Sequence, residues 1–195
     1  MVTPFDENLD LDLDVTVTLA RWLVDHGSDG LVVAGTTGEG ATLTDAEKLD
    51  LWRAVSEAVT VPVIAGTGSN DTAHTVELTR AAAGTGAAAA LVVTPYYNRP
   101  SQAGIEGHVR AVAATSDLPL VLYDVPGRTG RRLAPDTLLR LAREVPSVVA
   151  VKDAAGDLPS SARVAAQAPD GFDVYSGDDS LTLPLLAVGA VGVVG

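Results

Sequence analysis

Short apolar runs alternate with longer helix-like segments along this chain, and the alternation restricts the folds available to it. The runs lie at residues 30–35, 61–66, 89–94, 118–123, 148–152, 173–176 and 190–194. Most are apolar at successive positions, which predicts strands that are covered on both faces, as in a parallel sheet. A parallel sheet with helices between its strands is an α/β fold.

The segments between the runs have helical spacing. In residues 44–58 and at the next residue, one face carries the apolar side chains Leu49, Trp52, Val55 and Val59. Thr44 with Glu47 has the pattern of an N-terminal capping box. Four further segments have the same character: 71–83, 102–114, 135–143 and 158–168. Strands and helices are therefore expected to alternate.

Seven strand signals, with residues 1–3 as the stub of an earlier strand, favour a (β/α)₈ TIM barrel over an open doubly wound sheet. No G-x-G-x-x-G motif follows the first strand, which weakens a dinucleotide-binding alternative. Such barrels usually have about 250 residues. We therefore expect residues 1–195 to form one barrel domain that is truncated at both ends, without the C-terminal helical region. Unpaired strand edges then predict an unstable or aggregating chain.

The composition excludes several functional classes. The net charge is −12, which argues against binding to nucleic acid or to an anionic membrane surface. The chain has no cysteine, so disulfides, thiolate metal sites and a cysteine nucleophile are excluded. The N-terminus lacks the pattern of a signal peptide, and the apolar stretch 181–195 is shorter than the roughly 20 residues of a spanning helix. We expect a cytoplasmic protein.

Lys152 is the strongest candidate for a catalytic residue. It ends the apolar run 148–152, and the chain has only one other lysine, Lys48, beside 11 arginines. Active sites of barrels form at the C-terminal ends of the strands. A desolvated lysine there has a lowered pKa and can form a Schiff base with a keto acid. The structural alternative is an ion pair with the neighbouring Asp153.

Two other strand ends carry groups that suit a ligand. The glycines of the motif GTTGEG (35–40) let the backbone approach a small molecule, and the hydroxyls of Thr36 and Thr37 suit a carboxylate. An ordinary glycine-rich turn is the alternative interpretation. At another strand end, the phenol of Tyr123 can carry protons, and the planar guanidinium of Arg128 suits a second substrate's carboxylate. A tyrosine there can also be a core residue whose hydroxyl reaches solvent.

We expect no metal site. The three histidines, His26, His74 and His108, lie in predicted helices away from the strand ends, where packing or surface roles are favoured. The acidic pair at Asp178 and Asp179 precedes a helix-like segment and is interpreted as a helix N-cap.

Taken together, the motifs resemble the dihydrodipicolinate synthase / N-acetylneuraminate lyase family of class I aldolase-type barrels. They occur in order and cover essentially the whole chain: VTPF (2–5), GTTGEG (35–40), PVIAGTGSN (62–70), TPYYNRP (94–100), YDVPGRTG (123–130), VKDAAG (151–156), YSGDD (175–179) and GAVGVV (189–194). The sequences GTTGE, TPYYN and PGRTG resemble the dihydrodipicolinate synthase branch.

The resemblance implies a lyase that condenses pyruvate with aspartate 4-semialdehyde to 4-hydroxy-tetrahydrodipicolinate in lysine and diaminopimelate biosynthesis. It implies a homo-oligomer, usually a tetramer, and no cofactor beyond a covalent pyruvate imine on Lys152. Two alternatives stay open. One is a related pyruvate-dependent sugar-acid aldolase or dehydratase, such as 2-keto-3-deoxygluconate aldolase. The other is a non-catalytic barrel that binds keto acids.

The resemblance also implies roles for single residues. Lys152 is the Schiff-base lysine and Tyr123 the proton donor and acceptor. Thr36 and Tyr97 form a proton relay with Tyr123, and Tyr97 reaches across a dimer interface into the neighbouring site. The implied substrate-binding residues are Thr37 and the backbone near Val194 for pyruvate, Arg128 for aspartate semialdehyde, and Gly177.

The chain departs from the family pattern at four positions. Asp124 stands where Asn is commoner, and Asp153 where Glu is commoner. At the lysine feedback site, inhibited relatives have a Glu at the position of His74 and a His at the position of Lys48. We therefore expect lysine inhibition to be weak or absent.

Overall fold

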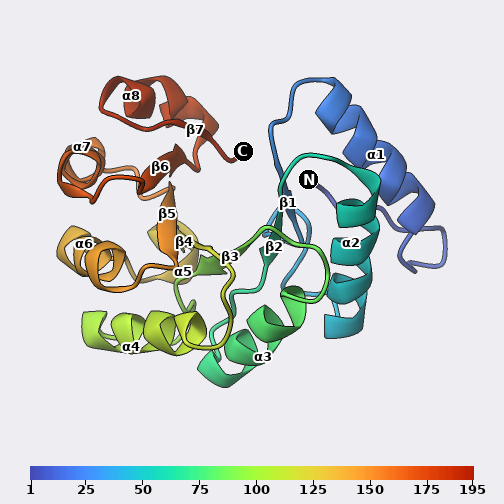
Figure 1. The fold of residues 1–195 in the computed structure, drawn as a ribbon, viewed down its shortest axis with the longest axis horizontal. Coiled ribbons are helices and arrows are strands. Elements are labelled where there is room, and N and C mark those ends of the chain that lie inside the picture. Colours follow the sequence, from blue (N-terminus) through green and yellow to red (C-terminus); the bar gives the residue numbers. More distant parts are fainter.

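Seven parallel strands form one curled sheet in the computed structural model, which describes residues 1–195 (Figure 1). Each strand pairs with the next one along the chain, as in a (β/α)₈ barrel. The strands are β1 (Leu31–Val33), β2 (Val63–Gly66), β3 (Ala89–Val93), β4 (Leu120–Asp124), β5 (Val148–Asp153), β6 (Asp173–Ser176) and β7 (Gly192–Val193). The predicted TIM-barrel fold is confirmed.

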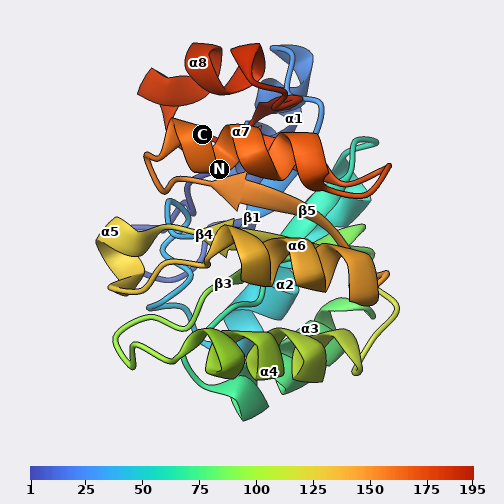
Figure 2. The same ribbon diagram turned by 90° about the vertical axis from the view of Figure 1, so that its left-hand side faces the viewer.

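Eight α-helices and one 3₁₀ helix accompany the sheet, and the long ones surround its outer face (Figures 1 and 2). The expected capping box of Thr44 and Glu47 is present, and Asp178 caps the 3₁₀ helix. No helix is long and apolar enough to cross a membrane. The helices are α1 (Leu13–Asp25), α2 (Asp45–Ala58), α3 (Thr72–Ala82), α4 (Gln102–Ala113), α5 (Pro126–Thr129), α6 (Pro135–Glu144), α7 (Leu158–Gln167), the 3₁₀ helix (Asp179–Leu181) and α8 (Thr182–Ala187).

The bulk of the hydrophobic core lies between the sheet and the helices. Two large clusters fill this layer, and Trp52 of α2 is fully buried there, where its indole N–H donates to the carbonyl of Val33 at 3.1 Å. A third, small cluster of Leu91, Tyr123 and Val125 lies apart from these two. Since apolar packing is concentrated in the outer layer, inward-facing positions are available for polar groups.

The register of the sheet places two rows of residues side by side. Tyr123 of β4 pairs with Lys152 of β5, and the next residues, Asp124 and Asp153, pair in turn. Successive side chains of a strand point to opposite faces. The Lys152 amine lies beside the Tyr123 ring, whereas Asp153 bonds to Ser161 of α7, so the first row faces the interior and the second row faces the helices.

The sheet is open between β7 and β1, and both termini lie in this gap (Figure 1). Residues 1–3, expected as a strand stub, form no strand, because only the amino group of Met1 bonds to the neighbouring strand, at the carbonyl of Val32 (2.9 Å). β7 has two residues, fewer than the expected range 190–194. The expected tendency to aggregate through open edges stays a prediction.

Candidate active site

Lys152 and Tyr123 meet inside the barrel. Lys152 is only 7% exposed, and its Nζ lies 4.6 Å from the centroid of the Tyr123 ring. The alternative ion pair between Lys152 and Asp153 does not form, since the Asp153 carboxylate accepts hydrogen bonds from the Ser161 hydroxyl (2.6 Å) and the Ala155 amide (2.9 Å). The amine of Lys152 is therefore free to react.

The surroundings of Lys152 favour its neutral form. Burial lowers the pKa of the Lys152 amine below its usual value, and this effect is the largest. The carboxylate of Asp179 raises the pKa, and the positive charge of Arg128 lowers it further. More of the nucleophilic neutral amine is consequently present at a given pH than for an exposed lysine.

Gly177 leaves the space that the stem of Lys152 occupies. A Cβ atom at this position would lie 2.9 Å from Cγ and 3.0 Å from Cε of Lys152. The amide of Gly177 donates to the carbonyl of Asp153 at 2.8 Å, which fixes the loop beside the end of β5. Gly177, which was predicted to be a substrate-binding residue, thus contacts the lysine stem in this structure.

A narrow cavity of about 10 Å³ lies next to Lys152, and Thr36, Thr37 and Val194 line it. The two threonine side chains are without hydrogen-bond partners in the chain and are exposed, so their hydroxyls are available to a ligand. The amide of Val194 is used already, because it donates to the carbonyl of Ser176 at 2.8 Å. The predicted contact of a carboxylate with the backbone near Val194 cannot use that N–H.

A cavity of about 1210 Å³ opens above this site, and it shares the lining residues Gly35, Thr36 and Leu91 with the narrow cavity. Tyr123 and Arg128 line it as well. Arg128 is exposed and forms no ion pair, so its guanidinium is free for an anionic group. The short helix α5 carries this arginine.

Tyr97 is exposed and lines the large cavity. Its residue is 88% exposed, and it has a positive φ of 68°, which is unusual for a bulky side chain. The Tyr97 amide donates to the carbonyl of Thr129 at 3.2 Å. No hydrogen bond joins the hydroxyls of Tyr97, Tyr123 and Thr36 within the chain. The proton relay through a neighbouring chain stays a prediction.

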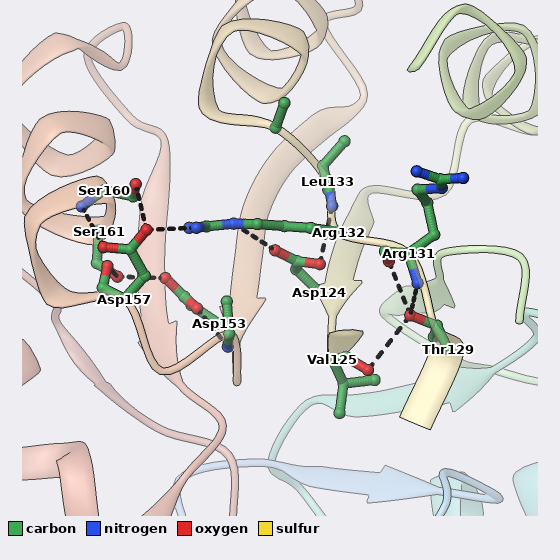
Figure 3. Close-up of polar contacts among 12 residues, drawn as sticks. Asp124, Val125, Thr129, Arg131, Arg132, Leu133, Asp153, Asp157, Ser160 and Ser161 are labelled. Carbon is green, nitrogen blue, oxygen red and sulfur yellow. Dashed lines mark hydrogen bonds and ion pairs between the residues drawn. The ribbon is translucent and has the colours of Figure 1, made fainter. Parts of the chain in front are cut away.

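A polar network lies on the face of β4 and β5 that is turned toward the helices (Figure 3). Asp124 Oδ1 accepts from the Leu133 amide at 2.9 Å, and its Oδ2 lies 3.8 Å from Nε of Arg132. The Nη1 of Arg132 forms an ion pair with Asp157, the N-cap of α7. Asp124 was singled out from the sequence, but Arg132 and Asp157 were not predicted. The usable signal was the position of Asp157 directly before a helical segment, which is typical of an N-cap.

The buried carboxyl of Asp124 has a strongly shifted pKa. Burial is the largest effect and raises the pKa of Asp124 to about 6. The negative charge of Asp153 also raises this pKa, whereas the hydrogen bond from the Leu133 amide and the positive charge of Arg132 lower it. By contrast, hydrogen bonds from Arg132 and Ser160 lower the pKa of Asp157 to about 2. The two carboxyls therefore ionise in different pH ranges.

The histidines belong to helices or their ends, as the sequence predicted, although His74 also lines the large cavity. His26 caps the end of α1 and stacks on Trp22, and His74 pairs with Asp45 at 2.9 Å. His108 is buried in α4, where its Nδ1 lies 2.9 Å from the hydroxyl of Thr72. These contacts explain the histidines as surface and packing residues.

We expect Gly177→Ala to lower the reactivity of Lys152, since the new Cβ displaces the lysine stem. Competitive acetylation, read by peptide mass spectrometry with Lys48 as internal reference, is expected to fall about tenfold at Lys152. Gly107→Ala is the matched control, because a Cβ there meets nothing within 4 Å. Equal labelling of Lys152 in the two variants would contradict the steric argument.

We expect Asp124 to make the folded state less stable as the pH rises. A pKa raised from 3.8 to about 6 means that the folded state binds more protons in that window. The free energy of unfolding should therefore fall by about 2 kcal/mol between pH 4 and 6. Denaturant titrations should show this slope reduced in Asp124→Asn and retained in Asp170→Asn, which alters an exposed carboxylate. Identical slopes in both variants would refute the assignment.

The arrangement agrees with comparisons to known proteins. The profile of the Dihydrodipicolinate synthetase family matches residues 1–195. The 4-hydroxy-tetrahydrodipicolinate synthase of Moorella thermoacetica is 55% identical over 100% of this chain and 67% of its own length. The crystal structure of dihydrodipicolinate synthase from Bacillus anthracis has a TM-score of 0.98 and 48% identity, with 100% of this chain and 67% of that one covered.

A third relative is the chloride-inhibited dihydrodipicolinate synthase of Acinetobacter baumannii, whose structure holds pyruvate. It has a TM-score of 0.96 and 42% identity, with 100% of this chain and 67% of that one covered. The chain thus spans about two thirds of the length of these relatives. The resemblance stated from the motifs is confirmed, and the chain belongs to the dihydrodipicolinate synthetase family.

Proposed function

We propose that this protein condenses pyruvate with aspartate 4-semialdehyde to 4-hydroxy-tetrahydrodipicolinate, through a Schiff base on Lys152. The observation that carries the proposal is the buried amine of Lys152, which lies beside Tyr123 and has a lowered pKa. The curated relatives with this activity, and the relative that holds pyruvate, support the choice of reaction and of the first substrate.

In the first step, the neutral amine of Lys152 attacks the keto carbon of pyruvate. The carbinolamine then loses water and becomes an imine. The phenol of Tyr123, next to the amine, is the group that moves protons onto and off the oxygen during this step. The exposed hydroxyl of Thr37, in the same lining as Lys152, is the group that binds the carboxylate of pyruvate.

In the second step, the iminium withdraws electrons from the adjacent methyl group, which loses a proton and becomes an enamine. The enamine carbon attacks the aldehyde carbon of aspartate 4-semialdehyde, and the new alkoxide takes a proton. Arg128, free of an acidic partner at the large cavity, is placed to bind the carboxylate of this substrate. The amine of the bound substrate then displaces Lys152 and closes the ring.

The proposal includes assembly into a homo-oligomer, which in this family is usually a tetramer. Tyr97 supports this part, because an exposed tyrosine held in a strained turn at the large cavity can also reach the site of a second copy. Thr36, which lines both cavities, and Tyr123 are the members of the relay contributed by the chain itself. The reaction needs no cofactor beyond the covalent imine.

Borohydride trapping with pyruvate tests the Schiff base. We expect a lactyl-sized adduct on Lys152 and none on Lys48, read by intact and peptide mass spectrometry. Lys152→Arg is the control, since it keeps the positive charge but forms no imine. An adduct on both lysines, or on neither, would refute the mechanism.

Turnover of each candidate aldehyde with pyruvate identifies the second substrate. With pyruvate present, we expect consumption of aspartate 4-semialdehyde and none of the sugar-acid aldehydes that a 2-keto-3-deoxygluconate aldolase uses. The reverse preference would favour the sister activity. Pyruvate binding without any adduct would favour the non-catalytic barrel.

We expect lysine to inhibit this protein weakly or not at all. Lys48 and His74 both lie at the large cavity and approach the single carboxylate of Asp45, at 3.7 Å and 2.9 Å. The positive charge of Lys48 at this position repels the amines of a bound lysine. Initial rates with increasing lysine should stay constant into the millimolar range, and His74→Glu with Lys48→His should increase sensitivity. A sub-millimolar inhibition constant in the unaltered protein would contradict this expectation.

A further inference from the structure

Arg132 extends from Asp124 at the end of β4 to Asp157 in the connection that follows β5 (Figure 3). Its Nη1 pairs with Asp157, the N-cap of α7, and its Nε lies 3.8 Å from Oδ2 of Asp124, the last residue of β4. The side chain thus connects one strand with the helix that follows the next strand. No other basic residue pairs with either carboxylate.

One atom of this bridge is left without a partner. The Nε of Arg132 is buried and makes no hydrogen bond. A buried donor without an acceptor lowers stability, so such groups are rare. The acceptor aimed at it is Oδ2 of Asp124, since Oδ1 of the same carboxyl is engaged by the Leu133 amide at 2.9 Å. A small approach of the two side chains completes the bridge.

The protonation of Asp124 decides whether the bridge closes. With Oδ1 engaged, a proton on the carboxyl resides on Oδ2, where it faces the Nε–H donor of Arg132 and blocks the bond. In the ionised form, Oδ2 accepts from Nε–H and gains a charge-assisted hydrogen bond. Arg132 then joins Asp124 and Asp157 through both ends of its guanidinium.

We propose that Arg132 is a positioning residue for the reaction, because its bridge from Asp124 to Asp157 holds Tyr123 in place opposite Lys152. The inference rests on the proposed function. We name this bridge the Arg132 clasp.

The backbone connects the clasp to Tyr123 and Lys152 over short distances. Asp124 follows Tyr123 directly, and Asp153 follows Lys152, so each reactive side chain is one residue from the network. The Ala154 amide donates to the carbonyl of Asp124 at 2.9 Å, and the Asp153 carboxylate is anchored to Ser161 of α7 at 2.6 Å. Since Asp157 is the N-cap of α7, the clasp fixes the end of β4 to the same helix that anchors β5. A misplacement of about 1 Å can lower a rate on the order of 100-fold.

The clasp makes catalysis depend on pH in a defined direction. The charged groups that face Asp124 are Asp153 from β5 and Arg132 from the connection to α6, and the pKa of Asp124 is about 6. The clasp therefore closes as the pH rises through about 6 and opens below it. Ionisation of a buried carboxyl lowers the free energy of unfolding, so the protein with the closed clasp is less stable than the protein with Asp124 protonated.

Steady-state kinetics of Arg132→Gln and Asp124→Asn test the proposal. We expect each to lower kcat about tenfold above pH 7, with the KM for pyruvate little changed, and to remove a wild-type step in kcat near pH 6. The double variant should be no worse than either single variant, because both open the same clasp. Arg163→Gln is the matched control, since Arg163 pairs with Asp136 at an exposed site on α6 and α7.

A second readout needs no turnover and separates this inference from the proposed function. Competitive acetylation compares Lys152 with Lys48 across pH. In both clasp variants, the Lys152 profile should shift by about half a pKa unit, or about threefold in rate, while Lys48 and the Arg163→Gln protein keep theirs. This outcome supports the clasp even where no pyruvate adduct forms.

Two results would overturn the proposal. One is a pair of clasp variants whose kcat profiles and Lys152 labelling match those of Arg163→Gln. The other is a lower melting temperature in the clasp variants without any change in the pH profiles, which would make Arg132 merely structural. If Arg132→Gln fails to fold, Asp124→Asn alone decides, because its amide oxygen can still accept from the Leu133 amide.

Discussion

The parallel register between β4 and β5 is the constraint on which the rest of the site depends. It pairs Tyr123 with Lys152 and Asp124 with Asp153. The alternation of side chains then directs the first pair into the barrel and the second pair toward the helices. A slip of β5 by one residue against β4 would bring Asp153 opposite Tyr123 and place its carboxylate where the amine now lies. The reactive groups and the groups that support them are therefore set by one ladder of hydrogen bonds.

Burial acts on the two faces of this ladder in opposite directions. It lowers the pKa of Lys152 and raises that of Asp124 to about 6, because in each case the charged form is the one that loses hydration. The apolar mass that provides this burial lies chiefly between the sheet and the helices. The interior has only a small apolar cluster, which leaves it open to a substrate. In this family member, the outer layer stabilises the fold and the inner face is left for chemistry.

Much of this arrangement follows from local patterns. The order of strands and helices could be predicted because buried strands and amphipathic helices have different periodicities. The capping box at Thr44 and the cap at Asp178 were predictable because each involves residues three or fewer positions apart. Lys152 and Tyr123 could be placed in one site, since the carboxyl ends of parallel strands meet at one edge. The ends of the sheet were less predictable, as the missing strand at residues 1–3 shows.

The sequence by itself thus determined the barrel, its strand order and the amine at its centre, all of which depend on periodicity and on strand ends. Only the tertiary structure decided that Asp153 turns from Lys152 to α7, and that Arg132 reaches from Asp124 to Asp157. Arg132 and Asp157 are 25 positions apart, and no local pattern joins residues at that separation. Their contact exists because the register of β4 and β5 and the packing of α7 bring the two loops together.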